Sequence, residues 1–175
     1  MAYQRRYTFK KTKTKKTMTS DERPSWDTTW LDVADVISLR SRCVRAQVGA
    51  VIVSKNQRVC ATGYNGPAAT WQHSGPCSGW CPRARGDSPL DNVYDACPSI
   101  HAEANALMYV DRSSVEGGTI YITNPPCMQC AKLITNSGIS RVVCYISESD
   151  MHRRPEQVLD YILSCRLKVE AIERR

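Results

Sequence analysis

The stretch GGTIYITNPPCMQCAKLITNSGISRVVCYI, residues 117–146, places a helical pattern between two apolar, β-rich runs. GGTIYIT (117–123) and RVVCYI (141–146) are typical of strands, and CMQCAKLITNSGI (127–139) is typical of a helix that ends near Gly138. Since crossover helices join parallel neighbours, this unit predicts two parallel strands that lie side by side in an α/β sheet.

The same alternation continues on both sides of this unit. PEQVLDYILSC (155–165) predicts a helix that begins at Pro155, and LKVEAIE (167–173) predicts a strand after it. VGAVIVS (48–54) and RVCATGYNG (58–66) are β-rich runs with a short connection, which predicts an antiparallel hairpin. The sequence therefore predicts a three-layer α/β/α domain, in which helices flank a five-stranded mixed sheet.

Two more helices and one long loop complete the expected architecture. A helix is expected over 100–112, and WLDVADVISLR (30–40) predicts another, because four apolar residues recur in it at helical spacing. These four are expected to form its buried face: Trp30, Val33, Ala34 and Ile37. Residues 66–98 are rich in Gly, Pro, Ser and Cys and predict a loop, which at this length is usually functional or held in place.

The positive charge of the chain is concentrated at its N-terminus. Seven of the 24 Lys and Arg residues fall within residues 1–20, and the rest equal the 17 Asp and Glu residues in number. RRYTFKKTKTKKT (5–17) shows no helical period, so residues 1–24 are interpreted as a disordered basic tail. This tail is either a solvated arm or a site for RNA, DNA or an acidic partner. Residues 25–175 have the length of a single domain.

Composition also bears on the compartment. The N-terminal region lacks the apolar segment of a signal peptide, and no stretch approaches the roughly 18 apolar residues of a membrane span. We therefore expect a soluble, cytoplasmic protein. Nine cysteines in an intracellular chain favour metal binding or buried thiols over disulfides.

Four residues with the chemistry of a metal site stand at the starts of two expected helices. His101 and Glu103 begin one helix, and Cys127 and Cys130 begin the other. One His and two Cys provide three zinc ligands and leave the fourth tetrahedral position open, as catalytic zinc sites do. Zinc lowers the pKa of bound water to about 7, and Glu103 would then accept and deliver the protons.

Each half of this pattern is ambiguous by itself. A histidine at a helix start often makes an ordinary hydrogen bond, and C-x-x-C can be a redox pair or half of a structural zinc site. Joined in this order, with Pro126 before the first Cys, the two halves match the H-x-E…P-C-x-x-C signature of zinc deaminases. The pattern therefore favours an enzyme with a catalytic zinc.

Over residues 26–172 the chain resembles the deoxycytidylate deaminase family of zinc-dependent cytidine and deoxycytidylate deaminases. The matching stretches are SRCVRAQVGAVIV, GYNG, HAEANAL and PPCMQCAKLI, the last followed by SGISRVV. GYNG together with HAE is more specific than the zinc motif, which cytidine, tRNA-adenosine and polynucleotide deaminases share in part. The resemblance implies the cytidine-deaminase-like fold and hydrolysis of dCMP to dUMP and ammonia, which supplies dUMP for thymidylate synthesis. Zinc-bound hydroxide would attack C4 of the cytosine, while Glu103 protonates N3 and then the leaving amine.

The resemblance also implies substrate contacts. The backbone around Ala102 would face the base, and Asn65 of GYNG would contact the sugar unless it only forms an Asn-Gly turn. Arg40 and Arg45 would approach the phosphate, although either could be a solvated charge at a helix end. Where many relatives have SPC or TLSPC, this chain has TNPPC, which places Asn124 near the pocket. Family members are commonly hexamers that dCTP activates and dTTP inhibits, and we expect a homo-oligomer of this kind.

The remaining cysteines divide into two groups. Bacterial and phage relatives that bind a second, structural zinc suggest such a site here, and a metal would explain how the long loop stays ordered. Its expected ligands are Cys43, Cys77, Cys81 and Cys97, with His73 as an alternative and unpaired loop thiols as the other interpretation. Cys60 and Cys144 in expected strands and Cys165 in an expected helix are interpreted as buried small hydrophobes.

Three other functions remain open at this point. A deaminase acting on a polynucleotide such as tRNA or single-stranded DNA could use the basic tail, but the neutral body lacks a basic stripe with interleaved aromatics, and Trp71 and Trp80 lie among cysteines. Related nucleotides, such as dCTP or a 5-modified dCMP, would suit the same zinc chemistry. A zinc-stabilised binding module without catalysis would not need Glu103, whose presence favours an enzyme.

Overall fold

A computed structural model describes residues 23–72, 75–86 and 97–174 of the 175-residue chain. The basic tail and His73 therefore lie outside the described residues. Five strands form one sheet in the order β2-β1-β3-β4-β5. Their bounds are Gly49–Val53 (β1), Val59–Tyr64 (β2), Thr119–Ile122 (β3), Arg141–Ile146 (β4) and Lys168–Glu173 (β5).

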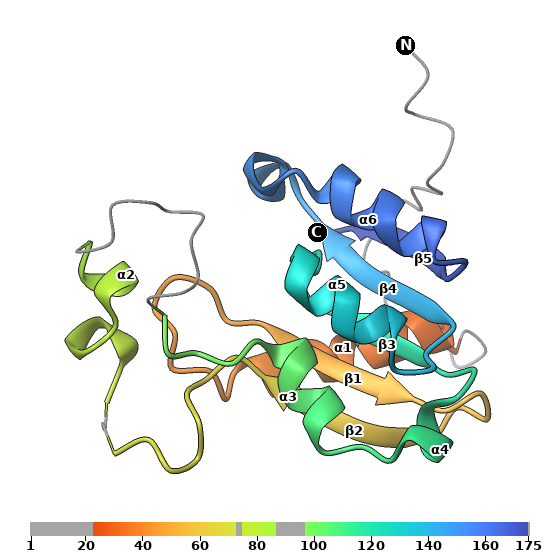
Figure 1. The fold of residues 1–175 in the computed structure, drawn as a ribbon, viewed down its shortest axis with the longest axis horizontal. Helices are drawn as coiled ribbons and strands as arrows, with labels where there is room; N and C mark the ends of the chain where they lie inside the picture. Colours follow the sequence, from red (N-terminus) through yellow and green to blue (C-terminus); the bar gives the residue numbers. More distant parts are fainter. Residues whose placement is uncertain (1–22, 73–74, 87–96, 175) are drawn as a thin grey trace.

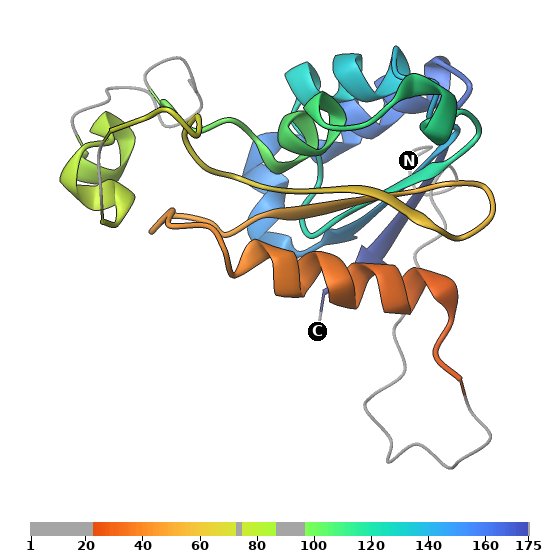
Figure 2. The ribbon, with the colours of Figure 1, turned by 90° about the horizontal axis from the view of Figure 1, so that it is seen from below.

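The sheet is mixed, as expected. β1 pairs antiparallel with β2 and β3, whereas β3, β4 and β5 run parallel. Helices cover both faces (Figure 1, Figure 2): α1 (Trp26–Ser38) packs on one, and α3 (Ala102–Met108), α5 (Met128–Thr135) and α6 (Pro155–Ser164) pack on the other. The predicted three-layer α/β/α architecture is therefore confirmed.

The two faces of the sheet are buried in alternation, as the pleat of a strand requires. In β1, Val51 and Val53 pack under α1, whereas Ile52 packs under the opposite helices. Tyr121 of β3 joins the α1 side, and its neighbours Ile120 and Ile122 point the other way. Burial on both faces explains why these strands read as continuous apolar runs in the sequence.

A charged cluster fixes the N-terminal end of α1 to the sheet. The Arg141 guanidinium donates two 2.8 Å hydrogen bonds to the Asp27 carboxylate and one of 2.6 Å to Glu170. The Tyr121 hydroxyl donates to Asp27 over 3.0 Å, and burial beside this carboxylate raises the pKa of Tyr121 to about 12. Bidentate pairs of this kind add geometric specificity to the helix–sheet contact.

The helix before the βαβ unit is shorter than the predicted 100–112. α3 ends at Met108, and a separate turn, α4 (Arg112–Val115), follows. Met108 and Tyr109 are 67% and 74% exposed, and only Leu107 and Val110 of the apolar residues at 107–110 are half-buried against the core. Because packing supplies most of the stability of a short helix, the pattern overestimated its length.

Other helix boundaries also differ from the predicted ones. The helix expected over 127–139 ends at Thr135, and Gly138, at φ +98°, lies in the turn beyond it. The long loop holds the short helices η1 (Cys77–Gly79) and α2 (Pro82–Arg85), and a further turn, η2 (Glu148–Arg153), follows β4. In α1 the side chains of Leu31 and Ala34 are buried. Trp30, Val33 and Ile37 of the predicted face are half-buried.

The burial expected for three cysteines holds for one of them. Cys144 is buried in β4, and Cys60 is half-buried. The prediction for Cys165 is wrong, because this residue caps the C-terminal end of α6 and is exposed. Within the described ranges, no helix is both long and apolar enough to cross a membrane.

Candidate active site

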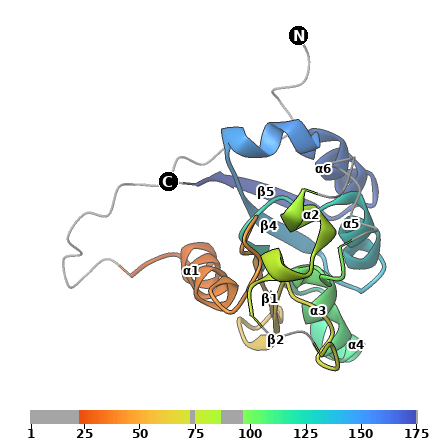
Figure 3. The same cartoon turned by 90° about the vertical axis from the view of Figure 1, so that its left-hand side faces the viewer.

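The candidate residues gather at one end of the sheet. The register pairs Gly49 at the start of β1 with Tyr64 at the end of β2, and Ile122 at the end of β3 with Cys144 near the end of β4. Figure 3 views the molecule from this side, with α2 in front of the sheet. The carboxyl ends of parallel strands meet here, which is where α/β proteins usually bind ligands.

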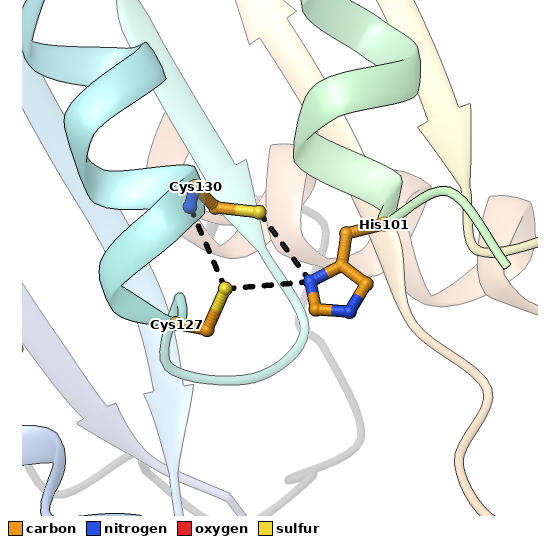
Figure 4. Close-up of side chains that lie close together, drawn as sticks. All are labelled: His101, Cys127 and Cys130. Carbon is orange, nitrogen blue, oxygen red and sulfur yellow. Dashed lines mark hydrogen bonds between the residues drawn. The ribbon is translucent and has the colours of Figure 1, made fainter. Parts of the chain in front are cut away.

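Three ligand atoms converge between α3 and α5 (Figure 4). His101 is the N-cap of α3, Cys127 is the N-cap of α5, and Cys130 lies in the first turn of α5. The Nδ1 atom of His101 lies 3.4 Å from each of the two sulfur atoms. In the part of the chain that the structure describes, the potential ligand atoms of these three residues all lie within 4.8 Å of one another.

The distances between these atoms fit zinc. With Zn–N and Zn–S bonds of about 2.0 and 2.3 Å, a nitrogen and a sulfur on one tetrahedral zinc lie about 3.5 Å apart. The measured 3.4 Å agrees with this geometry. The donor set of one imidazole and two thiols is also one that zinc prefers. These three residues can therefore hold a zinc ion and leave a position for a fourth ligand.

The two thiols of this group titrate as a pair. A hydrogen bond from Cys130, together with the nearby His101, lowers the pKa of Cys127 to about 4. The same hydrogen bond, with burial, raises the pKa of Cys130. The hydrogen bond to Cys127 also raises the pKa of His101 despite burial. The backbone N–H of Cys130 lies 3.5 Å from the Cys127 sulfur, so the start of α5 favours a thiolate there.

Glu103 lies inside the site rather than on its surface. Its side chain is 4% exposed, in the first turn of α3, where it interacts with the thiol of Cys130. Burial raises the pKa of the Glu103 carboxyl, and the charge of His101 opposes this effect. A buried carboxyl beside a metal-ligand group is a typical arrangement for proton transfer.

Two features of β2 fix where α3 begins. A Cβ atom on Gly63 would lie 2.5 Å from the backbone N of Ala106 and closer still to the carbonyl O of Ala102, so only glycine lets the helix approach the strand this closely. The amide of Asn105 donates a 2.7 Å hydrogen bond to the carbonyl of Tyr64. Together they hold the first turn of α3, and with it His101, against the sheet.

Asn65 has a structural role that the sequence did not reveal. Its side chain accepts a 2.8 Å hydrogen bond from the N–H of Val48 and donates one of 2.9 Å to the carbonyl of Ala46. Gly66 then forms an antiparallel bridge with Ile100, directly before His101. The backbone at 65–66 is therefore bridged to other segments instead of forming an Asn-Gly hairpin turn, and it lies beside the start of α3.

The other expected substrate residues lie at different depths. Ala102 is fully buried at the start of α3. Arg40 and Arg45 are exposed in the segment between α1 and β1, and Arg45 donates a 3.3 Å hydrogen bond to the carbonyl of Arg83. Residues 41–47 of this segment line a concavity of about 510 Å³.

A second, smaller cavity of about 20 Å³ is lined by Cys43 of the segment before β1 and by Cys77, Cys81 and Cys97 of the long loop. The sulfur atoms of Cys81 and Cys97 are 3.8 Å apart, and the Cys77 sulfur accepts a hydrogen bond from the N–H of Val44. Cys43 interacts with the thiol of Cys77, whose pKa burial raises. The structure thus brings the four residues to one place, but not as tightly as His101 and its two partners.

Sequence reasoning missed a polar network behind the site. Asp150 of η2 is 4% exposed and accepts hydrogen bonds from Ser147 and from Asn124. The signal was present, because SESD (147–150) has the spacing of a capping box, with an aspartate in place of the usual glutamate.

Comparisons with known proteins agree with this geometry. The family model described as "Cytidine and deoxycytidylate deaminase zinc-binding region" matches residues 24–146. A deoxycytidylate deaminase of Mycobacterium phage D29 is 46% identical over 132 residues, which cover 73% of this chain and 98% of the phage protein. The deoxycytidylate deaminase of Schizosaccharomyces pombe is 40% identical over 127 residues, which cover 71% of this chain but 38% of that protein.

A solved structure extends the likeness to three dimensions. The crystal structure of dCMP deaminase from the cyanophage S-TIM5 in complex with dCMP and dUMP is 26% identical, with a TM-score of 0.65. The match covers 86% of this chain and 98% of that chain. The sequence, the fold and the convergence of His101, Cys127 and Cys130 therefore lead to one conclusion: the chain belongs to the cytidine and deoxycytidylate deaminase family.

Proposed function

We propose that this protein is a zinc-dependent hydrolase that deaminates dCMP to dUMP and ammonia and so supplies dUMP for thymidylate synthesis. The observation that carries the proposal is the three-ligand site of His101, Cys127 and Cys130 with the buried carboxyl of Glu103 beside it. The choice of dCMP is supported by the relatives named deoxycytidylate deaminase and by the similar structure that holds dCMP and dUMP.

Each residue of the site has a distinct task in this reaction. Zinc supplies Lewis acidity that makes water a nucleophile near neutral pH. His101, Cys127 and Cys130 hold the ion. Glu103 takes one proton from the attacking water and delivers it to N3 of the cytosine, then moves the remaining proton of the hydroxyl added at C4 to the amine that leaves as ammonia. Its burial keeps bulk water from competing for these protons.

Substrate recognition involves the segments around this centre. The backbone at Ala102 faces the base, because this residue connects His101 to Glu103 at the buried start of α3. Asn65 contacts the sugar through the amide N–H and the oxygen lone pair that its hydrogen bonds to Ala46 and Val48 do not use. Arg40 and Arg45 supply positive charge for the phosphate from the segment before β1.

Neither rival function has comparable support. A polynucleotide deaminase would need stacking aromatics in a basic groove, whereas Trp71 and Trp80 pack against each other, with ring centroids 6.0 Å apart, beside the cysteine cluster. A non-catalytic zinc module would not need a buried carboxyl next to the ligands.

A product assay with zinc-loaded protein tests the proposal. We expect dCMP to be converted to dUMP in preference to dCTP, a 5-modified dCMP, deoxycytidine, CMP and a short single-stranded DNA. Faster deamination of the DNA, with a steep loss of affinity as salt rises, would instead support the polynucleotide deaminase. Turnover of none of these substrates by the zinc-loaded protein would contradict the enzyme altogether.

We also propose a structural zinc in the cysteine-lined cavity. The 3.8 Å between the Cys81 and Cys97 sulfurs matches the separation of about 3.8 Å expected for two thiolates on one zinc, and Cys43 and Cys77 line the same cavity. Such an ion would tie the short helices η1 and α2 to the segment before β1.

Metal analysis of freshly purified protein checks this second site. We expect about two zinc ions per chain, falling to about one in Cys97→Ser, because that substitution removes one of four thiolate ligands. Cys165→Ser is the matched control, since this thiol is exposed and lies outside the cavity. A value near one zinc in the unaltered protein would refute the structural site.

The proposal extends to the domain organisation, oligomeric state and regulation of the protein. Residues 25–175 form one deaminase domain after a basic tail at 1–24, and the protein works as a homo-hexamer in the cytoplasm. The nine free thiols suit a reducing compartment. Regulation by dCTP and dTTP is part of the same proposal, in which a 2.8 Å hydrogen bond from Ser41 to the carbonyl of Asn65 links the segment before β1 to GYNG.

A further inference from the structure

A buried carboxylate that the zinc chemistry does not use lies beside the active site. Asp150 is 4% exposed, and one of its oxygens accepts hydrogen bonds from the N–H (3.0 Å) and the hydroxyl (2.7 Å) of Ser147. Its other oxygen accepts a 3.3 Å hydrogen bond from the side-chain amide of Asn124. The carboxylate therefore joins the segment after β4 to the loop after β3.

These bonds settle which way the Asn124 amide points. Its nitrogen faces Asp150, while its oxygen lies 3.4 Å from the hydroxyl of Thr123. That hydroxyl accepts a 3.0 Å hydrogen bond from the N–H of Gly49, so its proton is available to Asn124. The chain of bonds runs from β1 through Thr123 and Asn124 to η2, and each member has a defined donor and acceptor role.

The network adjoins the zinc ligands. Asn124 precedes Cys127 by three residues, and the two prolines between them restrict the backbone. The buried thiol of Cys144 lies within electrostatic range of both Asp150 and Glu103. A second anchor holds the same loop, because Arg174 donates a 3.3 Å hydrogen bond to the carbonyl of Thr123.

We infer that Asp150 is a positioning residue for the nucleotide pocket: through its bond with Asn124 it fixes the loop after β3, whose backbone then forms part of the wall that binds the pyrimidine nucleotide. Asp150 itself does not touch the substrate. The inference rests on the proposed function. It assigns to Asp150 an effect on nucleotide binding rather than on zinc or on proton transfer, because the hydrogen bond from Asn124 ties Asp150 to the loop after β3.

An exchange of the two side chains tests the inference. Asp150→Asn leaves two amides facing each other, and Asn124→Asp leaves two carboxylates facing each other, so each single change breaks the hydrogen bond. The double variant restores it with donor and acceptor reversed, while Ser147 can still donate to the oxygen at position 150. In each single variant we expect the KM for dCMP and the dissociation constant of dUMP to rise about tenfold. In the double variant we expect both constants to return most of the way to the values of the unaltered protein.

Several readouts separate positioning from folding. Zinc content and kcat are expected to stay near those of the unaltered protein, and Glu148→Gln, an exposed acid in the same segment, is the control for lost charge. The inference would be overturned if the KM and the dUMP affinity of Asp150→Asn stayed within twofold of the values for the unaltered protein. It would also be overturned if the double variant bound dUMP no more tightly than the weaker of the two single variants. Because dUMP binding is measured without turnover, unaltered protein that binds dUMP but leaves dCMP unchanged would refute the proposed reaction and still decide the role of Asp150. Unaltered protein that binds no dUMP would refute both.

Discussion

Glu103→Gln is expected to lower kcat for dCMP by about 10³-fold, within the range of about 10² to 10⁴ that general acid–base catalysis contributes. The amide has almost the same shape as the carboxyl, so the buried position in α3 stays filled. It cannot accept the proton of the attacking water or pass protons to the base. Steady-state kinetics of dUMP formation measures the effect.

Zinc content and dUMP affinity are expected to stay unchanged in this variant, because Glu103 is not one of the three ligands. Glu116→Gln, at an exposed position, is the matched control and should leave kcat intact. A Glu103→Gln protein that keeps its zinc and more than a tenth of the kcat would show that another group moves the protons.

Gly63→Ala is expected to destabilise the protein by on the order of 3 kcal/mol and to reduce its zinc affinity. The new methyl group would overlap the backbone of α3 at Ala102 and Ala106, and backbone cannot rotate away as a flexible side chain can. Relief of the overlap requires α3 to move off β2, which carries His101 away from Cys127 and Cys130. Urea unfolding and competition with a zinc chelator measure the two effects.

Gly79→Ala provides the control for this change. No atom lies within 4 Å of a Cβ placed on Gly79, and its φ is outside the left-handed region, so alanine should fit there. Equal stability of the Gly63→Ala and Gly79→Ala proteins would mean that close contact between α3 and β2 does not position the zinc ligands.

Much of this architecture could be predicted because local pattern and tertiary packing agree. The strand at 141–146 and the helix beginning at Pro155 lie where the sequence predicts them. The zinc ligands could be grouped because His101 and Cys127 both stand at helix starts, and the strands that precede these helices, β2 and β3, finish at the same end of the sheet. In such cases a residue's position along the chain decides its position in space.

The failures lie where a long-range contact decides. Apolar residues continue the helical pattern to Val110, and Val110 packs against the core, but α3 ends at Met108, where Met108 and Tyr109 are exposed. Cys165 has an apolar side chain in a helical pattern, yet its exposure depends on which way the chain turns after α6. The hydrogen bond of Asp150 to Asn124 joins residues 26 positions apart, and no local periodicity records such a pair.

The position of β1 between β2 and β3 has a consequence for the order of folding. Ala50 must pair with Ile122 before the sheet is continuous, so the chain has to close a long loop that includes the whole cysteine-rich segment. Contacts of this sequence separation form slowly, because the entropy of loop closure is lost before the pairing is gained. The helix starts that carry the zinc ligands therefore come together late. A nascent chain that has not yet made β3 holds one of the three zinc ligands, so it is the closure of the sheet that brings the complete ligand set together.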